Sequence, residues 1–211
     1  MKKFKILCLV ILGLTSTSTF AEQASDQLIA SLKKIDTFQA QFNQKIRDAN
    51  GENISNSKGK VVIRRPGQFY WKSQSPDPML VIADGKFLWT YDIDLAQVTK
   101  QTQKDTIKNS PAALLAGKVS DLTTQFNIGT ADKCDAKTDQ CYTLSPKQKD
   151  ATFSNILIGF AKDKLIEIKM HDTMGQEVHT LFSTIEMNKP VNMKLFSFQP
   201  PKGVDIIQSG T

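Results

Sequence analysis

Short segments of alternating or continuous apolar residues, bounded by turn-forming residues, run through most of this chain. They lie at 60–65, 68–73, 79–83, 86–91 and 95–102, and again at 124–129, 140–144, 153–160, 164–170, 177–187 and 196–198. The dipeptides Pro66-Gly67 and Asp84-Gly85 separate strands of the first group, because such residues favour tight turns. Strands joined by short turns pair as an antiparallel meander, and so large an open sheet tends to curl. We therefore predict a mainly β (α+β) fold, a curved antiparallel sheet that is closed by helices.

One long helix is predicted before the strands. Apolar residues recur at three- and four-residue spacing from Gln23 to Phe42, with Ser25 or Asp26 near the N-cap. The end of this stretch, from Phe38, also alternates like a strand, so the two interpretations overlap there. The polar segment 49–57 is predicted to be a loop.

A second, short helix is predicted between the two groups of strands. The apolar segment begins with Asn109-Ser110-Pro111 and ends at Gly117, which are start and stop signals for a helix. A helix of about two turns is not stable alone, so it must lie against an apolar surface. We expect it to lie as a lid over an apolar face of the sheet.

Residues 1–21 have the features of a secretory signal peptide. Lys2, Lys3 and Lys5 precede an apolar run that is too short to span a membrane, and small residues lead to a cleavage site after Ala21. The expected mature protein is a single periplasmic domain at 22–211. It should carry no lipid anchor, because Glu22 and not a cysteine follows the cleavage site.

Two cysteines, Cys134 and Cys141, remain after that cleavage, with a polar, turn-like segment between them. In an oxidising compartment they are predicted to form a disulfide that staples a hairpin. A metal site is the alternative, but no histidine or third cysteine lies nearby in the sequence. We expect no metal and no cofactor.

Charge and motifs argue against nucleic-acid binding and catalysis. Without the signal-peptide lysines the formal charge falls from +6 to +3, and the other lysines are scattered among acids. The sequence contains no G-x-S-x-G, H-E-x-x-H or phosphate-binding glycine loop. His171 and His179 are expected to face solvent, and Asp92 and Asp94 to lie in a turn. The chain is therefore not predicted to be an enzyme.

The odd-numbered positions of the first hairpin are large and apolar, except for Arg65. If they share a concave face with similar residues of later strands, the sheet presents an apolar trough, which pattern alone cannot distinguish from a filled core. An arginine on that face needs acceptors for its guanidinium. Arg65 could extend to water at the turn, or it could bind carbonyl groups at the end of the 111–116 helix and so latch the lid.

Four segments resemble the LolA family of outer-membrane lipoprotein carrier proteins. They are Arg65–Trp71 (RPGQFYW), Ala83–Tyr91 (ADGKFLWTY), Asp105–Gly117 and Phe196–Val204 (FSFQPPKGV). The resemblance implies an incomplete antiparallel β-barrel, a half-barrel, with a helical lid over a hydrophobic cavity. It also implies that the chain, as a monomer, receives lipoproteins from the inner-membrane LolCDE transporter and delivers them to the outer-membrane receptor LolB.

The same resemblance places the family's lid-latching arginine on Arg65 and its partner-contacting aromatic residue on Phe69, at the rim of the trough. We expect the acyl-chain cavity to be lined by Val61, Ile63, Trp71, Phe87, Trp89, Tyr91, Leu114, Leu115, Ile166, Ile168 and Met170. The cysteine pair is a departure from the family's pattern. The alternative function is a periplasmic interaction or regulatory module of the same fold, with a filled core and no lipid cargo.

Overall fold

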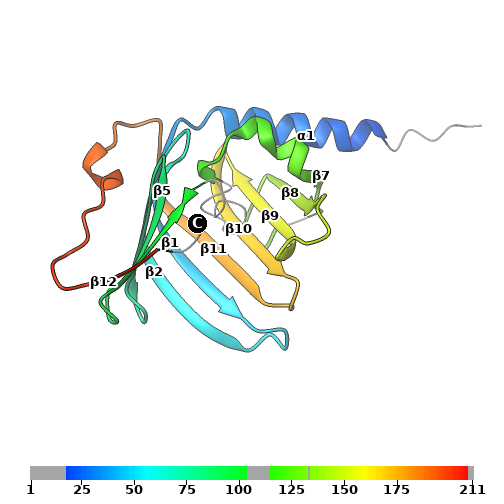
Figure 1. Cartoon of the computed structure of the whole chain (residues 1–211). Coiled ribbons are helices and arrows are strands. Elements are labelled where there is room, and N and C mark those ends of the chain that lie inside the picture. The colour runs from blue at the N-terminus through cyan, green and yellow to red at the C-terminus, as the bar shows by residue number, and fades with distance from the viewer. Residues whose placement is uncertain (1–17, 104–114, 133, 209–211) are drawn as a thin grey trace, which may run out of the picture.

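The computed structural model describes residues 18–103, 115–132 and 134–208. Within these residues the chain forms one curved, open sheet with a few helices (Figure 1). The strands are β1 Thr37–Arg47, β2 Asn53–Arg64, β3 Gln68–Ser75, β4 Met79–Asp84, β5 Phe87–Asp92, β6 Gln97–Thr102, β7 Phe126–Thr130, β8 Gln140–Pro146, β9 Phe153–Ala161, β10 Lys164–Asp172, β11 Glu177–Met187 and β12 Asp205–Gln208. The helices are α1 Ser18–Lys33, α4 Leu122–Gln125 and the 3₁₀ turns η2 Val119–Asp121 and η3 Met193–Phe196.

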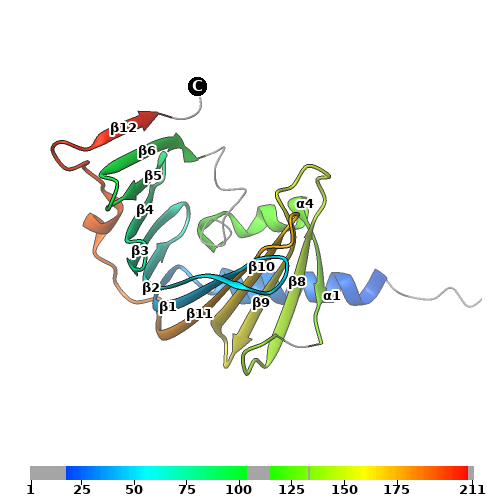
Figure 2. The same cartoon turned by 90° about the horizontal axis from the view of Figure 1, so that it is seen from below.

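The twelve described strands follow the order β12-β6-β5-β4-β3-β2-β1-β11-β10-β9-β8-β7. All neighbours are antiparallel except β12, which runs parallel to β6. Strand β1 joins the two meanders by pairing with both β2 and β11. Seen from below, the sheet bends into two arms that do not close on each other (Figure 2). The first arm contains β2–β6 and β12, and the second contains β7–β11. The predicted open half-barrel is confirmed.

The interior lies on the concave face of the sheet. One continuous cluster of buried apolar side chains includes Leu28 and Leu32 of α1, Leu115, Ala116 and Leu122 of the segment after β6, and inward-facing residues of both arms. Helix α1 covers part of this face and contacts β7. No described helix combines the length and apolar character that crossing a membrane requires.

Helix α1 begins earlier than predicted, and the strand interpretation of the stretch from Phe38 is confirmed. It begins at Ser18, so Ser25 and Asp26 lie inside the helix and not at its N-cap. It ends at Lys33, and the alternation from Phe38 belongs to β1. The Asn188 carboxamide stabilises this transition, because its oxygen accepts the Asp36 N–H at 2.9 Å and its nitrogen donates to the Lys34 carbonyl at 2.7 Å. This contact joins residues far apart in the chain, so the position of the helix end cannot be predicted from local periodicity.

Two other boundaries were predicted incorrectly. The polar segment 49–57 is a strand from Asn53 onward, because it extends the ladder with β1. Residues 196–198 form no strand, since η3 ends at Phe196 and the C-terminal strand is β12. The predicted helix start at 109–111 lies outside the described residues.

The predicted inward position of Phe87, Trp89 and Tyr91 is wrong. Ala83 pairs with Leu88 across the Asp84-Gly85 turn, so Leu88 shares the inner face with Ala83 and the odd-numbered residues of β5 face outward. Two of these rings instead pack against Phe198 of the C-terminal segment, with centroid distances of 5.6 Å for Trp89 and 6.1 Å for Tyr91. They belong to the convex side.

Candidate functional site

A small pocket lies on the concave side, where the end of α1 meets both arms of the sheet. It is lined by Ile35, Phe38, Ile63, Arg65, Leu115 and Leu165, is partly open to solvent, and has no room for a water molecule. Ligand pockets usually have volumes of about 300–1,000 Å³. The described residues are therefore closely packed around this pocket, and Arg65 is the only charged side chain in its lining.

Arg65 is held beside this pocket by its backbone and by one side-chain contact. Its N–H donates to the Asp36 carbonyl at 2.9 Å, and its Nη1 donates to the Gly117 carbonyl at 3.5 Å. Its Nε is buried and has no hydrogen-bond partner among the described residues. Burial lowers the pKa of Arg65 to about 10, and the nearby charge of Asp36 partly opposes this shift. The guanidinium therefore remains charged at neutral pH in a poorly solvated place.

The turn that carries Arg65 is bonded to residues on both sides of segment 104–114. The Gly67 N–H donates to the Ala116 carbonyl at 2.8 Å, and the Gly67 carbonyl accepts from the Gln103 side chain. The same Gln103 side chain accepts the Gly85 N–H at 2.9 Å. Sequence reasoning missed Gln103, because a polar residue at a strand end gives no sign of bonds to two distant turns.

Several residues predicted for the cavity lie on the concave face. Val61, Ile63, Ile168 and Leu115 belong to the interior cluster, and Trp71 and Met170 pack against it. Trp71 also stacks on Phe42, with ring centroids 3.8 Å apart. Gly59 leaves room for this stack, since a Cβ there would lie 2.6 Å from the Phe42 ring. Leu114 lies outside the described residues.

Two predicted positions need correction. Phe69 is only 2% exposed and pairs with Ile63 and Ala83 in the middle of the inner face, so its predicted place at an accessible rim is wrong. Ile166 does not pack against the interior cluster. A bulge between Leu165 and Glu167 shifts the β9–β10 register, and Leu165 lines the pocket instead.

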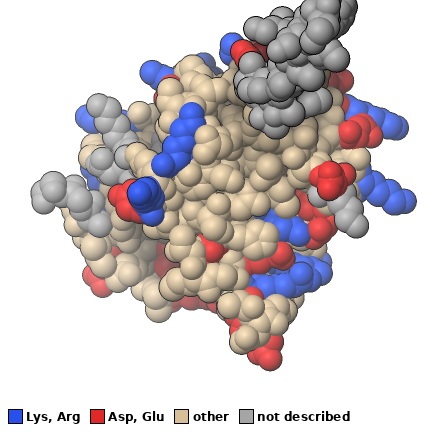
Figure 3. All heavy atoms as spheres, turned by 90° about the vertical axis from the view of Figure 1, so that its right-hand side faces the viewer, with Lys and Arg blue, Asp and Glu red and all other residues tan. Residues whose placement is uncertain are grey.

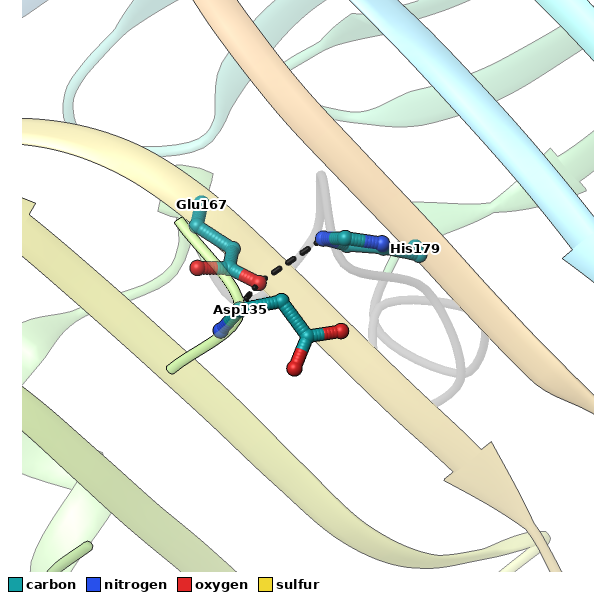
Figure 4. Close-up of side chains that lie close together, drawn as sticks. All are labelled: Asp135, Glu167 and His179. Carbon is teal, nitrogen blue, oxygen red and sulfur yellow. Dashed lines mark hydrogen bonds and ion pairs between the residues drawn. The ribbon is translucent and has the colours of Figure 1, made fainter. Parts of the chain in front are cut away.

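The convex face of the arm formed by β7–β11 carries a polar cluster of the exposed Asp135 with Glu167 and His179, which are buried (Figure 4). The predicted disulfide between Cys134 and Cys141 is present, and it ties the connection between β7 and β8 to the start of β8. This connection covers Glu167, whose carboxylate accepts the N–H groups of Asp135 at 3.3 Å and Ala136 at 2.8 Å. His179 Nε2 lies 2.7 Å from the same carboxylate. His179 is therefore largely buried, contrary to prediction.

The cluster could be read as a metal site, because ligand atoms of Asp135, Glu167 and His179 lie within 4.8 Å of one another. However, Lys169 Nζ contacts the Asp135 carboxylate and lies 3.7 Å from that of Glu177. The hydrogen bond from Lys169 is the main cause of the lowered pKa of Asp135. Because Lys169 already pairs with Asp135 and two backbone N–H groups already bind Glu167, the donor set fits a hydrogen-bonded ion-pair network better than a cation site.

Charges on the side of the molecule shown in Figure 3 are mixed. Lysine, arginine, aspartate and glutamate side chains lie around a broad area without charge. This view shows no field of a single sign, which agrees with the interpretation of the scattered charges in the sequence.

Comparison with known proteins agrees with this architecture. The family model described as outer membrane lipoprotein carrier protein LolA matches residues 33–199. The chain belongs to the LolA family. An outer-membrane lipoprotein carrier protein of Hahella chejuensis is 33% identical over 99% of this chain and 99% of its own length. One of Coxiella burnetii is 35% identical over 96% of this chain and 95% of its own.

A solved structure supports the fold separately. An uncharacterised conserved protein of Thermus thermophilus matches with a TM-score of 0.55 at 11% identity, covering 88% of this chain and 99% of that one. At such low identity the likeness concerns the fold alone, so it shows that the open sheet with a few helices is an arrangement also found in an experimental structure.

Proposed function

We propose that this chain is a periplasmic carrier that binds the acyl chains of lipoproteins on the concave face of its sheet. The supporting observation is the continuous apolar cluster on that face, with a pocket that contains the charged Arg65. Each buried methylene contributes about 0.8 kcal/mol, so acyl chains need such a surface to cross an aqueous compartment. Carrying a lipid requires no catalysis, and membership of the LolA family supports the same role.

In this proposal the carrier receives lipoproteins from LolCDE and delivers them to LolB as a monomer. Residues 1–21 would be removed as a signal peptide. Cleavage after Ala21 would shorten α1 but leave its buried residues Ala24, Leu28 and Leu32. Mass spectrometry of the protein purified from the periplasm tests this point, since the expected N-terminal residue is Glu22.

Acyl binding is tested by displacement of a fluorescent fatty acid from the purified protein, together with native mass spectrometry of the protein incubated with a lipoprotein. The expected result is saturable displacement and a complex with the mass of one carrier and one lipoprotein. Leu115→Glu would add a charge to the pocket lining and should weaken binding of the fluorescent fatty acid. Lack of binding by the folded wild-type protein would refute the carrier function.

One observation favours the alternative of a protein-interaction module with a filled core. The pocket among the described residues has no room for a water molecule, so acyl chains can enter it only if the side chains around it move. The same binding experiment separates the two functions. A folded protein that takes up no acyl ligand, yet retains a protein partner from the periplasm, would support the interaction module.

A further inference from the structure

Strands β1, β2 and β3 contain no aspartate or glutamate but six basic residues. These are Lys45, Arg47, Lys58, Lys60, Arg64 and Lys72, which we call the basic face. Register places all six on the convex side. Phe38, Ala40 and Phe42 of β1, with Val61 and Ile63 of β2, face the interior, and the basic residues occupy the alternate positions.

The charges of the basic face are poorly balanced. Lys60 lies directly opposite Lys72 in the β2–β3 ladder, and both are exposed. Like charges in this position destabilise a sheet. Among the described residues only Arg47 of the six has an ion pair, with Glu177 at 3.3 Å, while Arg64 donates to the Gln68 side chain at 2.8 Å. Stability alone does not favour such a face, so a ligand of opposite charge is the better explanation.

Aromatic side chains continue the same convex side on β5. Phe87 and Trp89 are half-buried there, and Lys100 of β6 lies over both rings, with its Nζ 3.9 Å from the Phe87 centroid and 4.8 Å from that of Trp89. Lysine beside tryptophan and phenylalanine suits the headgroup region of a membrane, where amphipathic rings and ammonium groups are both accommodated. This combination favours a lipid surface over an acidic protein.

We propose that the basic face is a docking surface for the anionic phospholipid headgroups of a membrane. Each lysine near an anionic surface strengthens binding about fivefold, and the attraction declines over a Debye length. A few lysines therefore give weak, salt-dependent binding that remains reversible. The pocket lies on the opposite side of the sheet, so this docking does not depend on acyl binding and can be tested separately from it.

The test is co-sedimentation with vesicles of phosphatidylglycerol and phosphatidylcholine, compared with vesicles of phosphatidylcholine alone. The protein is purified from the periplasm, and all variants are checked for the same N-terminus. Wild type should bind only the anionic vesicles, less at high salt. The triple variant Lys58→Gln, Lys60→Gln, Lys72→Gln should bind them about a hundredfold more weakly.

A matched control removes the same charge elsewhere. The variant Lys33→Gln, Lys149→Gln, Lys202→Gln changes three exposed lysines outside the basic face and should retain most of the binding. Thermal unfolding provides a second measurement, because Lys60→Gln relieves the repulsion with Lys72 and should keep or raise the melting temperature. The proposal is overturned if wild type does not bind anionic vesicles, if it binds neutral ones equally, or if both triple variants lose binding to the same extent.

Discussion

His179 Nε2 lies 2.7 Å from Oε1 of Glu167, a carboxylate that is completely buried under the disulfide-bridged connection between β7 and β8. Two backbone N–H groups of that connection, from Asp135 and Ala136, donate to the same carboxylate. A buried carboxylate is tolerated only when it is paired and hydrogen-bonded. Glu167 and the connection above it therefore depend on each other.

Glu167→Ala should destabilise the fold by about 3–5 kcal/mol, because it leaves two backbone donors without their acceptor and removes the carboxylate beside the buried imidazole of His179. Urea unfolding at neutral pH measures this loss. Glu186→Ala, at an exposed position of β11, is the control and should change stability by less than about 0.5 kcal/mol. Equal effects of the two substitutions would contradict the structural role of Glu167.

Asp135 should contribute a pH-dependent part of the stability. The hydrogen bond from Lys169 lowers the pKa of Asp135 below its usual value of 3.8, although burial opposes this shift. A depressed carboxyl pKa stabilises the fold above the unfolded pKa, and this contribution is lost as pH falls through the lower, folded pKa. Asp135→Asn should therefore lower the urea midpoint at neutral pH, and the difference from wild type should shrink below about pH 4.

The Asp135 effect should be modest, because its side chain is 55% exposed and solvent screens the pair. Asp163→Asn is a suitable comparison, since Asp163 pairs with Lys34 where both side chains are largely exposed. A difference between Asp135→Asn and wild type that stays constant from neutral pH to about pH 3 would refute the assignment.

Removal of the disulfide should cost about 2–3 kcal/mol, which is the chain-entropy contribution of so short a loop. We expect the double substitution Cys134→Ser, Cys141→Ser to lower the urea midpoint, and a reductant to lower that of the wild type similarly. The double variant should not respond to reductant. Thiol labelling of the denatured, non-reduced wild type should find no reactive cysteine in the mature chain, and two reacting thiols would disprove the pairing.

The sequence predicted the strands better than it predicted their faces. Alternation and turn residues locate most of the meander, because both are local properties. Which face a strand presents depends on the turn before it. At Asp84-Gly85 the pairing of Ala83 with Leu88 exchanges odd for even positions, and Phe87, Trp89 and Tyr91 therefore lie outside. A shift of a single residue reverses a whole strand, so odd numbering cannot be carried across a hairpin.

The remaining errors also arise from contacts between distant segments. Because of the bulge beside Leu165, Leu165 and not Ile166 faces the interior. No residue pattern in β10 indicates this bulge. The cysteines have no histidine near them in the sequence, yet folding brings His179 of β11 beside the connection that carries Cys134. Arg65 was identified as unusual because a charge in an apolar pattern is visible in the sequence itself.

Substitutions of Phe69 are expected to change the stability of the fold before they change lipid uptake. Because it is buried among Ile63 and Ala83, Phe69→Ala should cost about 3–5 kcal/mol, and Phe69→Glu should destabilise the fold still more. Phe69→Leu should cost less than about 1.5 kcal/mol and remain folded, which allows lipoprotein uptake from inner-membrane vesicles to be measured. If Phe69→Glu were as stable as wild type, the ring would not be buried.

Arg65→Leu should separate loading from release. In the unloaded carrier the guanidinium donates to the Gly117 carbonyl, although at 3.5 Å this is a weak bond, and its Nε is unpaired among the described residues. We expect lipid entry to break this contact and release to restore it. Leucine removes the contact and adds apolar surface to the pocket, and both changes favour the loaded state. The variant should accept lipoprotein but transfer it poorly to LolB.

Transfer from purified loaded carrier to the receptor tests this expectation. Arg64→Leu is the matched control, because Arg64 is the adjacent residue, points to the convex side and bonds only to Gln68 in the described part of the chain. Because Arg64 belongs to the basic face, the comparison uses a soluble receptor and no vesicles, and under these conditions Arg64→Leu should release its cargo like the wild type. Since Arg65→Leu also removes a buried charge, its urea midpoint should not fall below that of the wild type. Unchanged transfer by a folded Arg65→Leu protein would refute the latch, because release would then not depend on the guanidinium.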